Sequence, residues 1–331
     1  MMKRLLIGLL AGMTLLGCGN TKKTADTENS TTTRMVGPTF SADSAMAYCQ
    51  RQCDFGPRTM NSEAHDRCGE WIAGKFRQLG MEVTLQQTTL KGYDGTPLRA
   101  TNIIASYRPE RQERIMLCAH WDSRPWADND PDEANHRTPV MAANDGASGV
   151  GVMLEIARLI ALQDSTAVGL DFICFDAEDW GTPQWAEKTG DDSDTWALGA
   201  QYWSEHPHRE GYKARYGILL DMVGGQGARF YQEGVSLHFA PNIVNKVWTA
   251  AEAVGVGSYF PREENGMITD DHLPVNQKAG IPCIDIIPYY PDCTESSFGP
   301  TWHTVNDDMQ HLDKNTLQAV GQTLVQVIFE E

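Results

Sequence analysis

Apolar residues recur along most of the chain at two spacings, one typical of helices and one typical of strands. In the stretch that begins at Asn61-Ser62-Glu63, helical spacing relates Cys68, Trp71, Ile72, Phe76 and Leu79, and Gly80 is a suitable stop. Residues 168–175 instead form a short apolar run rich in β-forming side chains. The same patterns predict further helices from Ser41, at 149–162, 197–205, 243–254 and from Asp313 to the end, and strands at 81–90, 99–108, 114–119, 216–220 and 283–287.

This order of elements predicts an α/β fold. Strands that alternate with helices favour a mostly parallel sheet with helices on both faces. The first two strands are joined through residues 92–97 and are expected to form a hairpin, which makes the sheet mixed. Because no second linker interrupts the pattern, we expect a single three-layer α/β/α domain over residues 39–331 with a twisted central sheet.

The N-terminal residues have the layout of a secretory signal. Lys3-Arg4 is followed by a short apolar stretch and by Leu15-Leu16-Gly17-Cys18, which resembles a bacterial lipobox. We expect a signal peptide over residues 1–17, a lipid on Cys18 and a flexible polar tether over residues 18–38. The alternative is an ordinary cleaved signal. The prediction is an exported lipoprotein, anchored in the outer or inner membrane and facing the periplasm.

Charge and cysteine content narrow the possible partners. The formal net charge of -17 disfavours nucleic acid, which binds to basic surfaces. Export permits disulfides, and the seven cysteines beyond Cys18 leave at least one thiol free, with the pairing open. The acidic run at residues 128–133 lacks the spacing of an EF-hand and is expected to be a solvated loop.

Acids and histidines follow the predicted central strands. The strand at 168–175 leads into the pair Glu178-Asp179, and two such carboxylates after a buried strand favour a nearby cation. His120, Asp221 and His303 also come after strands, and Asp145 precedes the helix at 149–162. Each alone has an ordinary explanation, such as a turn or a cap. Together at one edge of a sheet they are the ligand types of a zinc site with an open catalytic position.

The motifs themselves resemble a known family. His-x-Asp-Ser at 120–123, Asn-Asp-Gly-Ala-Ser-Gly at 144–149, the acid pair, Leu-Asp-Met at 220–222 and Trp-His-Thr at 302–304 resemble the zinc aminopeptidase-like fold of peptidase family M28, in the family's order. That family contains two-zinc aminopeptidases and one-zinc glutaminyl cyclases, which convert N-terminal glutamine to pyroglutamate and release ammonia. Trp302, the Asp-Asp-His at 270–272 and the segment 305–313 resemble the cyclases.

The resemblance implies a metal site. One zinc per chain would be held by Asp145, Asp179 and His303, although animal cyclases carry glutamate where this chain has Asp179. His120 matches a second-zinc ligand of the aminopeptidases and is not a ligand in the cyclases, so its residue type leaves the number of metal ions open.

The reaction implied for the cyclases also needs a proton carrier. Glu178 would move the proton, Asp221 and Asp270 would share its acid cluster, and Trp302 would wall the glutamine pocket. Alternatively, residues 270–271 are only a helix cap and Trp302 belongs to the core.

The expected partners are peptides or proteins that begin with glutamine, and the expected state is a monomer. The competing functions are a two-zinc aminopeptidase and a catalytically silent peptide-binding lipoprotein.

Overall fold

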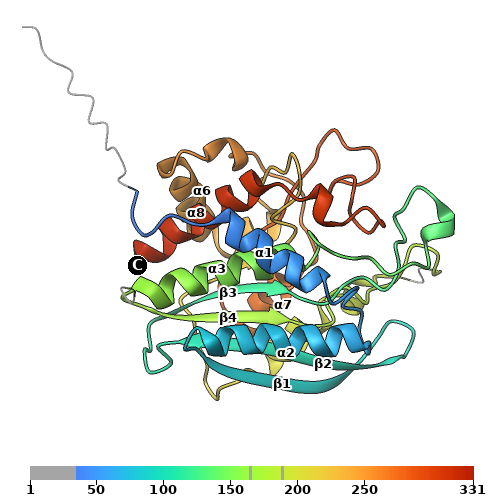
Figure 1. The fold of residues 1–331 in the computed structure, drawn as a ribbon, viewed down its shortest axis with the longest axis horizontal. Helices are drawn as coiled ribbons and strands as arrows, with labels where there is room; N and C mark the ends of the chain where they lie inside the picture. The colour runs from blue at the N-terminus through green and yellow to red at the C-terminus, as the bar shows by residue number, and fades with distance from the viewer. Residues whose placement is uncertain (1–34, 164–165, 188–189) are drawn as a thin grey trace, which may run out of the picture. The chain divides into compact units, whose positions relative to one another are not determined.

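A mixed six-stranded sheet forms the centre of the protein (Figure 1). The structure is a computed structural model that describes residues 35–163, 166–187 and 190–331. The strands are β1 (Glu82–Lys91), β2 (Pro97–Tyr107), β3 (Arg114–His120), β4 (Gly169–Phe175), β5 (Gly217–Leu220) and β6 (Cys283–Ile286), in the spatial order β1-β2-β4-β3-β5-β6. The pairs β3–β4, β3–β5 and β5–β6 are parallel, whereas β1–β2 and β2–β4 are antiparallel. The predicted mixed sheet with a hairpin at its edge is confirmed.

Helices precede and connect these strands. They are α1 (Ala42–Cys53), α2 (Glu63–Gln78), α3 (Ala147–Gln163), α4 (Leu198–Glu205), α5 (Gly234–Phe239), α6 (Pro241–Ala253), α7 (His272–Pro274) and α8 (Lys314–Phe329). Ser41, Ser62 and Asp313 cap α1, α2 and α8 through their side-chain oxygens, as polar residues at helix starts are expected to do. The sequence pattern missed α5, which is only six residues long and too short to show a helical period.

Side chains of each central strand alternate between two hydrophobic cores, so that both faces of the sheet are covered. In β3, Ile115 and Leu117 belong to the larger core, which α1, α2, α3, α6 and α8 cover. Cys118, on the opposite face of the same strand, belongs to a smaller core that includes Trp203 of α4. The three-layer α/β/α architecture is therefore confirmed.

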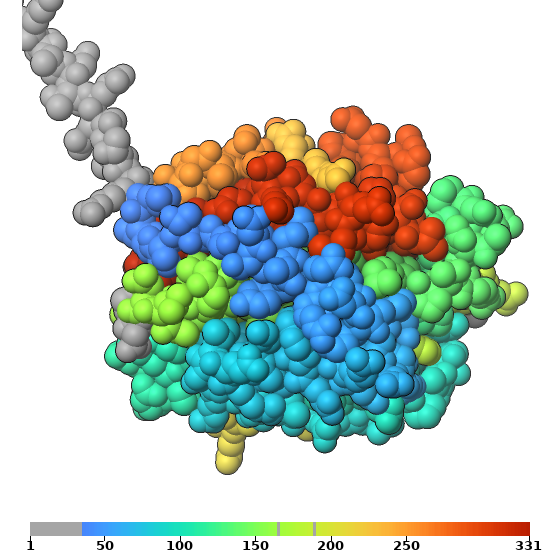
Figure 2. All heavy atoms as spheres, in the orientation of Figure 1, coloured from blue at the N-terminus to red at the C-terminus, as the bar shows by residue number. Residues whose placement is uncertain are grey.

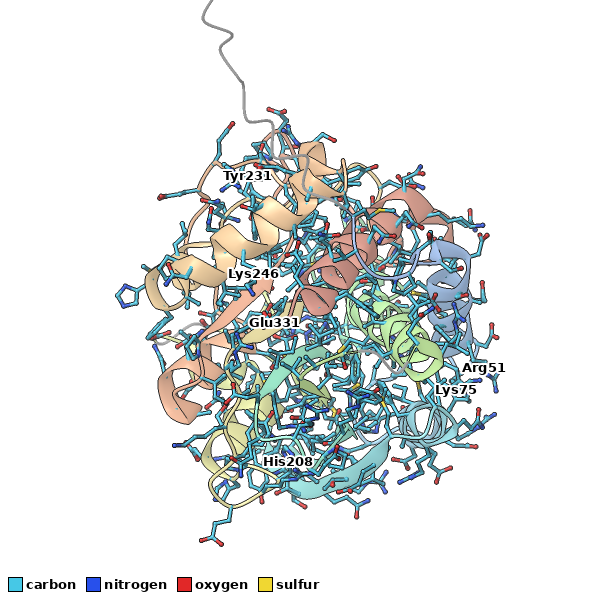
Figure 3. The ribbon with its side chains drawn as sticks, turned by 90° about the vertical axis from the view of Figure 1, so that its left-hand side faces the viewer. Arg51, Lys75, His208, Tyr231, Lys246 and Glu331 are labelled. Atoms are coloured by element: carbon cyan, nitrogen blue, oxygen red, sulfur yellow. The ribbon has the colours of Figure 1, made fainter. Side chains whose placement is uncertain are left out.

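The two ends of the described domain pack beside one another. Helix α1 contacts α8, and Figure 2 shows these first and last segments side by side in blue and red. Phe40 packs so closely on Gly321 of α8 that a Cβ there would lie 2.3 Å from its ring. Glu331 pairs with Arg215 at 2.6 Å and with Lys246 of α6 (Figure 3). The last helix thus closes the larger core.

The predicted signal peptide, Cys18 and most of the predicted tether lie outside the described residues, and these assignments stay predictions. Within the described part of the chain, no helix is both long enough and apolar enough to cross a bilayer. The seven cysteines found there are all free thiols, and each except Cys293 is buried.

Candidate active site

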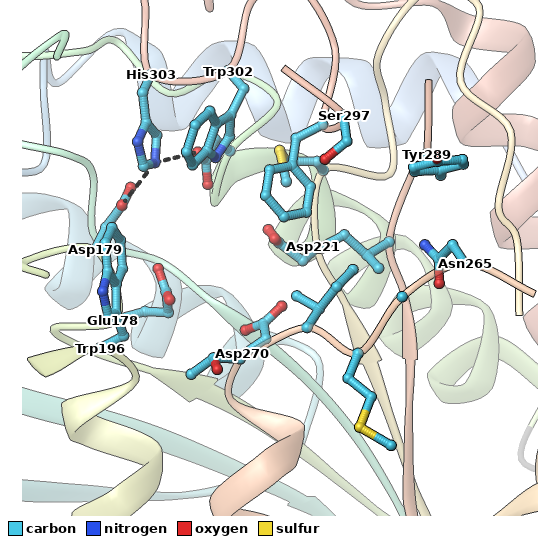
Figure 4. Close-up of a pocket in the computed structure, with 18 residues that line it drawn as sticks. Glu178, Asp179, Trp196, Asp221, Asn265, Asp270, Tyr289, Ser297, Trp302 and His303 are labelled. Atoms are coloured by element: carbon cyan, nitrogen blue, oxygen red, sulfur yellow. Dashed lines mark ion pairs between the residues drawn. The ribbon is translucent and has the colours of Figure 1, made fainter. Parts of the chain in front are cut away.

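The carboxyl ends of the parallel strands open into a cavity of about 560 Å³, at the edge where α/β sheets bind their ligands (Figure 4). Most of the site residues expected from the sequence line it, namely Asp145, Glu178, Asp179, Asp221, Asp270, Trp302 and His303. They come from the loops after β3, β4, β5 and β6 and from the turn before α7. Parallel strands explain this convergence, because their carboxyl ends meet at one edge of the sheet.

Asp145, Asp179 and His303 are buried and could hold a metal ion, and we call them the metal group. Their potential ligand atoms lie within 4.8 Å of one another. The Nε2 atom of His303 lies 3.1 Å from Oδ1 of Asp179 and 3.5 Å from Oδ2 of Asp145. Both carboxylate oxygens of Asp179 are buried and accept no hydrogen bond from the described residues. Buried carboxylate oxygens that accept no hydrogen bond are rare, so these atoms fit a cation. Two carboxylates and an imidazole are also a ligand set that zinc accepts in catalytic sites.

Charged groups behind the metal group orient its histidine. Nδ1 of His303 lies 3.5 Å from Oδ1 of Asp128, which in turn accepts two hydrogen bonds from Arg124. Arg124 also donates to the backbone carbonyl oxygen of Asp179 at 3.0 Å. A carboxylate that fixes the second nitrogen of a metal-binding histidine sets both its tautomer and its ring orientation.

This arrangement corrects one expectation from the sequence. The acidic run at 128–133 is not a solvated loop throughout, because Asp128 and Asp130 are both buried. Arg124 neutralises Asp128, and Asp130 accepts hydrogen bonds from the backbone N–H groups of Asp132 and Val305. Arg124 and Asp132 are near in the sequence, but Val305 is 175 positions from Asp130 and approaches it only in the folded chain.

Two further aspartates hold the backbone of the site. Asp122 accepts the N–H groups of Glu178 and Asp179 at 3.1 and 3.2 Å. Asp307 accepts the N–H groups of Asn144 and Asp145 at 2.7 and 2.9 Å. Asp122 belongs to the motif at 120–123 and Asp307 to the segment 305–313. The sequence analysis predicts no role for either residue, and only their position within these motifs indicates that they belong to the site.

Left-handed backbone conformations concentrate around the cavity. Ala142, Ala177, Ala197, Met222 and His303 have φ values between 50° and 56°, and each lines the cavity or lies within three residues of a residue that does. Such conformations cost non-glycine residues on the order of 1 kcal/mol each. Surrounding structure therefore holds these turns in place, and Asp122 does so for the turn at Ala177.

Glu178, Asp221 and Asp270 are the acids that face the cavity beside the metal group. Burial and the neighbouring charge of Asp179 raise the pKa of Glu178 well above its usual value. Burial and the charge of Asp221 likewise raise the pKa of Asp270. A buried carboxyl group with a raised pKa is better suited to accept and release a proton near neutral pH than an ordinary surface acid.

The helix-cap interpretation of residues 270–271 is wrong. The side chain of Asp271, at the start of α7, makes no capping hydrogen bond. Instead its backbone N–H donates to the carboxylate of Asp270, which helps to fix that carboxylate at the cavity wall.

His120 lies between the metal group and the acids. Its Nε2 atom is 3.0 Å from Asp145 and 3.2 Å from Asp221, and its Nδ1 atom is 3.6 Å from Asp122. Burial disfavours the charged ring, but the three neighbouring carboxylates outweigh that effect and raise the pKa of His120. His120, Asp145 and Asp221 form a second group with the spacing of metal ligands.

Aromatic rings enclose the metal group. Trp302 stacks on the His303 ring with centroids 3.8 Å apart, and Trp196 stacks on it with centroids 6.1 Å apart. Both tryptophans line the cavity. Trp302 is therefore a cavity-wall residue and not part of the hydrophobic core. Trp196 also receives the Arg124 guanidinium on its face at 4.6 Å.

Comparisons with known proteins agree with this geometry. A glutaminyl cyclase from Bacteroides thetaiotaomicron, solved with N-acetylhistamine, is 55% identical and matches 89% of this chain and 100% of its own with a TM-score of 0.86. A structure from the same organism described as a leucine aminopeptidase precursor is 54% identical and matches 90% of this chain and 99% of its own with a TM-score of 0.85.

A curated relative points to the same family. Aminopeptidase YwaD of Bacillus subtilis is 28% identical over 83% of this chain, which spans only 54% of that relative's length. The sequence profile of peptidase family M28 matches residues 102–328. This range includes the metal group and the three acids that face the cavity beside it, Glu178, Asp221 and Asp270. The chain belongs to peptidase family M28.

Proposed function

We propose that the protein is a glutaminyl-peptide cyclotransferase, which converts an N-terminal glutamine into pyroglutamate and releases ammonia. The observation that carries this proposal is the buried acid group of Glu178, Asp221 and Asp270, which faces the same cavity as the metal group. Such a group can move a proton between two nitrogen atoms without a water nucleophile. The 55% identity to a bacterial glutaminyl cyclase over nearly the whole described domain supports it.

Asp145, Asp179 and His303 would hold one zinc ion per chain. When bound there, zinc would act as a Lewis acid that polarises the γ-carboxamide carbonyl of the substrate. Asp128 would keep the His303 ring in the orientation that ligation needs, and Asp307 and Asp122 would hold the backbone of the two carboxylate ligands.

Glu178 would carry the proton. In cyclisation the substrate's α-amino nitrogen forms a bond to the carbonyl carbon of the γ-carboxamide, and the bond from that carbon to the amide nitrogen breaks. The attacking nitrogen must lose one proton and the departing nitrogen must gain one before it leaves as ammonia. One carboxyl group can accept the first and deliver the second, because both nitrogens are attached to the same carbon during the reaction.

The remaining groups would position the substrate and exclude water. Asp221 and Asp270 lie on the cavity wall with Glu178, where their carboxyl oxygens can accept hydrogen bonds from an amino group. Trp302 and Trp196 cover the metal group with apolar surface. Keeping water away from the polarised carbonyl favours cyclisation over hydrolysis, because water is the competing nucleophile.

A second candidate is a two-zinc aminopeptidase. The specific observation in its favour is the group of His120, Asp145 and Asp221, whose spacing suits a second metal ion. In that case Asp145 would serve both ions, and Asp221 would be a ligand rather than a member of the acid group. A silent peptide-binding protein is the third candidate, and the intact set of acids and metal-group residues disfavours it.

A paired assay separates these candidates. The purified protein is given one Gln-initiated and one Leu-initiated aryl amide, and zinc is counted on the same sample. The cyclase predicts ammonia release from the Gln substrate, no cleavage of either amide bond and one zinc per chain. Release of leucine by a protein with two zinc ions per chain would establish the aminopeptidase instead.

For location, we propose an exported lipoprotein attached to a membrane through Cys18 and acting as a monomer in the periplasm. The positive n-region, the short apolar stretch and Leu15-Leu16-Gly17-Cys18 support this proposal. Substrates would then be exported peptides or proteins that begin with glutamine.

A further inference from the structure

A small apolar hollow adjoins the mouth of the cavity. It has a volume of about 240 Å³ and is lined by Val235, His238, Phe239, Met267, Leu273 and Gln277. Met267 lines both this hollow and the cavity, so the two share a wall. Its side chain is 73% exposed and that of Phe239 is 38% exposed. Large apolar side chains that gather at the rim of a polar site are typical of a binding surface.

The hollow has a fixed wall. Glu233 accepts the N–H groups of Val235 and Ser236 at the start of α5 and the N–H group of Ile268, each at 2.7–2.9 Å. Met267 also packs on Gly234, where a Cβ would lie 2.9 Å from its Cγ atom. Hydrogen bonds and close packing thus join α5 to the segment that carries Met267, which makes the hollow a preformed feature of the fold.

The direction of a bound peptide follows from the arrangement of the cavity. In Figure 4, Asp179 and His303 lie at one end of the cavity, and Asn265 and Tyr289 lie at the other. A glutamine whose side chain reaches the metal group and whose amine faces the acids must direct the rest of the peptide away from that end. Segment 265–270 lines the cavity from Asp270 to the shared wall at Met267, and it therefore offers a surface along which the peptide can lie.

Asn265 offers a polar contact on that route. Its Oδ1 atom is buried and has no hydrogen-bond partner among the described residues. Buried amide oxygens without a donor are uncommon, and an extended peptide presents backbone N–H groups at regular intervals. Asn265 can therefore accept from a peptide that enters beside Met267.

We propose that the hollow is a subsite for an apolar side chain at the second or third position of the substrate, after the N-terminal glutamine. This inference rests on the proposed cyclase function and adds a substrate preference to it. None of the lining side chains is acidic or basic apart from His238, so a charged side chain gains no ion pair there. The nearby acids and the net charge of -17 further disfavour aspartate and glutamate at these positions.

The test compares kcat/KM for ammonia release from Gln-X-Ala and Gln-Ala-X amides, where X is glycine, leucine, phenylalanine or glutamate. We expect leucine or phenylalanine to exceed glycine by about tenfold at one of the two positions, mainly through KM, since an apolar side chain leaves water. Glutamate should fall below glycine.

Two variants locate the preference. Met267→Ser and Phe239→Ser should each reduce the apolar-to-glycine ratio to about threefold or less. Leu162→Ser is the matched control, because Leu162 is also exposed but lies on α3, outside the cavity and the hollow. This variant should keep the wild-type ratio. A wild-type ratio near one, or an unchanged ratio in both variants, overturns the subsite while leaving the cyclase intact. Absence of ammonia from every Gln peptide would instead refute the cyclase, and the subsite with it.

Discussion

Asp122 accepts a hydrogen bond from the backbone N–H of Asp179 at 3.2 Å, and its other oxygen accepts from Glu178. One buried carboxylate thus holds the turn that carries both the expected metal ligand and the expected proton carrier. Asparagine at this position has the same shape but only one acceptor oxygen, so one N–H would face an amide NH₂ group.

Asp122→Asn should therefore weaken zinc binding and lower turnover, each by roughly 10–100-fold, which is typical for residues that support metal ligands. Metal affinity is measured by competition with a chelator, and turnover by ammonia release. Asp54→Asn is the control, because Asp54 is partly exposed at the end of α1 and should affect neither quantity. Equal zinc affinity in Asp122→Asn and the control would show that the turn does not depend on this carboxylate.

Glu178→Gln should keep zinc and lose most turnover. The variant retains the size of the side chain and removes its ability to accept a proton, which typically lowers a rate by about 10²–10⁴-fold. Zinc content and KM are measured beside kcat, since a defect confined to kcat indicates lost proton transfer. Near-normal kcat in this variant would assign the proton carrier to Asp270 or Asp221.

The environment of Glu233 should make the stability of the folded protein depend on pH. Burial opposes its charge, but His272 and the backbone donors outweigh that effect and lower the pKa of Glu233 to about 2. A carboxylate whose pKa is lower in the folded state stabilises the fold above its unfolded pKa, and that stabilisation is lost as the pH falls through the folded value. The contribution is of order 3 kcal/mol at neutral pH.

The variant Glu233→Gln should accordingly unfold in less urea than the native protein at pH 7, with a smaller difference at pH 3. Both measurements are made with chelator present, so that metal binding does not contribute. Glu63→Gln, which alters an exposed side chain of α2, should match the native protein at both pH values. A stability difference that stays constant between the two pH values would contradict the assigned pKa.

Regular elements and motif positions could be predicted from sequence because both are local. The helical period around Ile72 and the β-forming run before Phe175 are visible within a few residues, and the structure has α2 and β4 there. The convergence of His120, Asp145 and His303 followed from the expectation of parallel strands and from the family resemblance. These predictions needed no knowledge of side-chain contacts.

Long-range partners could not be predicted in this way. Asp307 holds Asn144 across 163 positions of sequence, and His303 meets Asp128 only in the folded chain. An acidic residue is usually exposed, so its burial becomes predictable only once its partner is placed. Glu233 was missed for the same reason, since its role joins α5 to the segment before Asp270.

Cys18→Ala tests the proposed location. If the lipid is attached to Cys18, the variant should leave the membrane fraction while the catalytic domain keeps its activity, since Cys18 lies outside that domain. Fractionation of cells followed by an activity assay on each fraction measures both quantities. Membrane attachment that survives the substitution would contradict the lipobox prediction.

Product analysis in water labelled with heavy oxygen tests the central proposal most directly. A Gln-initiated peptide is incubated with the zinc-loaded protein, and the mass of the peptide product is measured by mass spectrometry. The cyclase predicts a product that is lighter by one ammonia and contains no heavy oxygen, because the peptide's own amine is the nucleophile. Free glutamine with heavy oxygen in its carboxylate, together with a peptide shortened by one residue, would contradict the cyclase and identify hydrolysis.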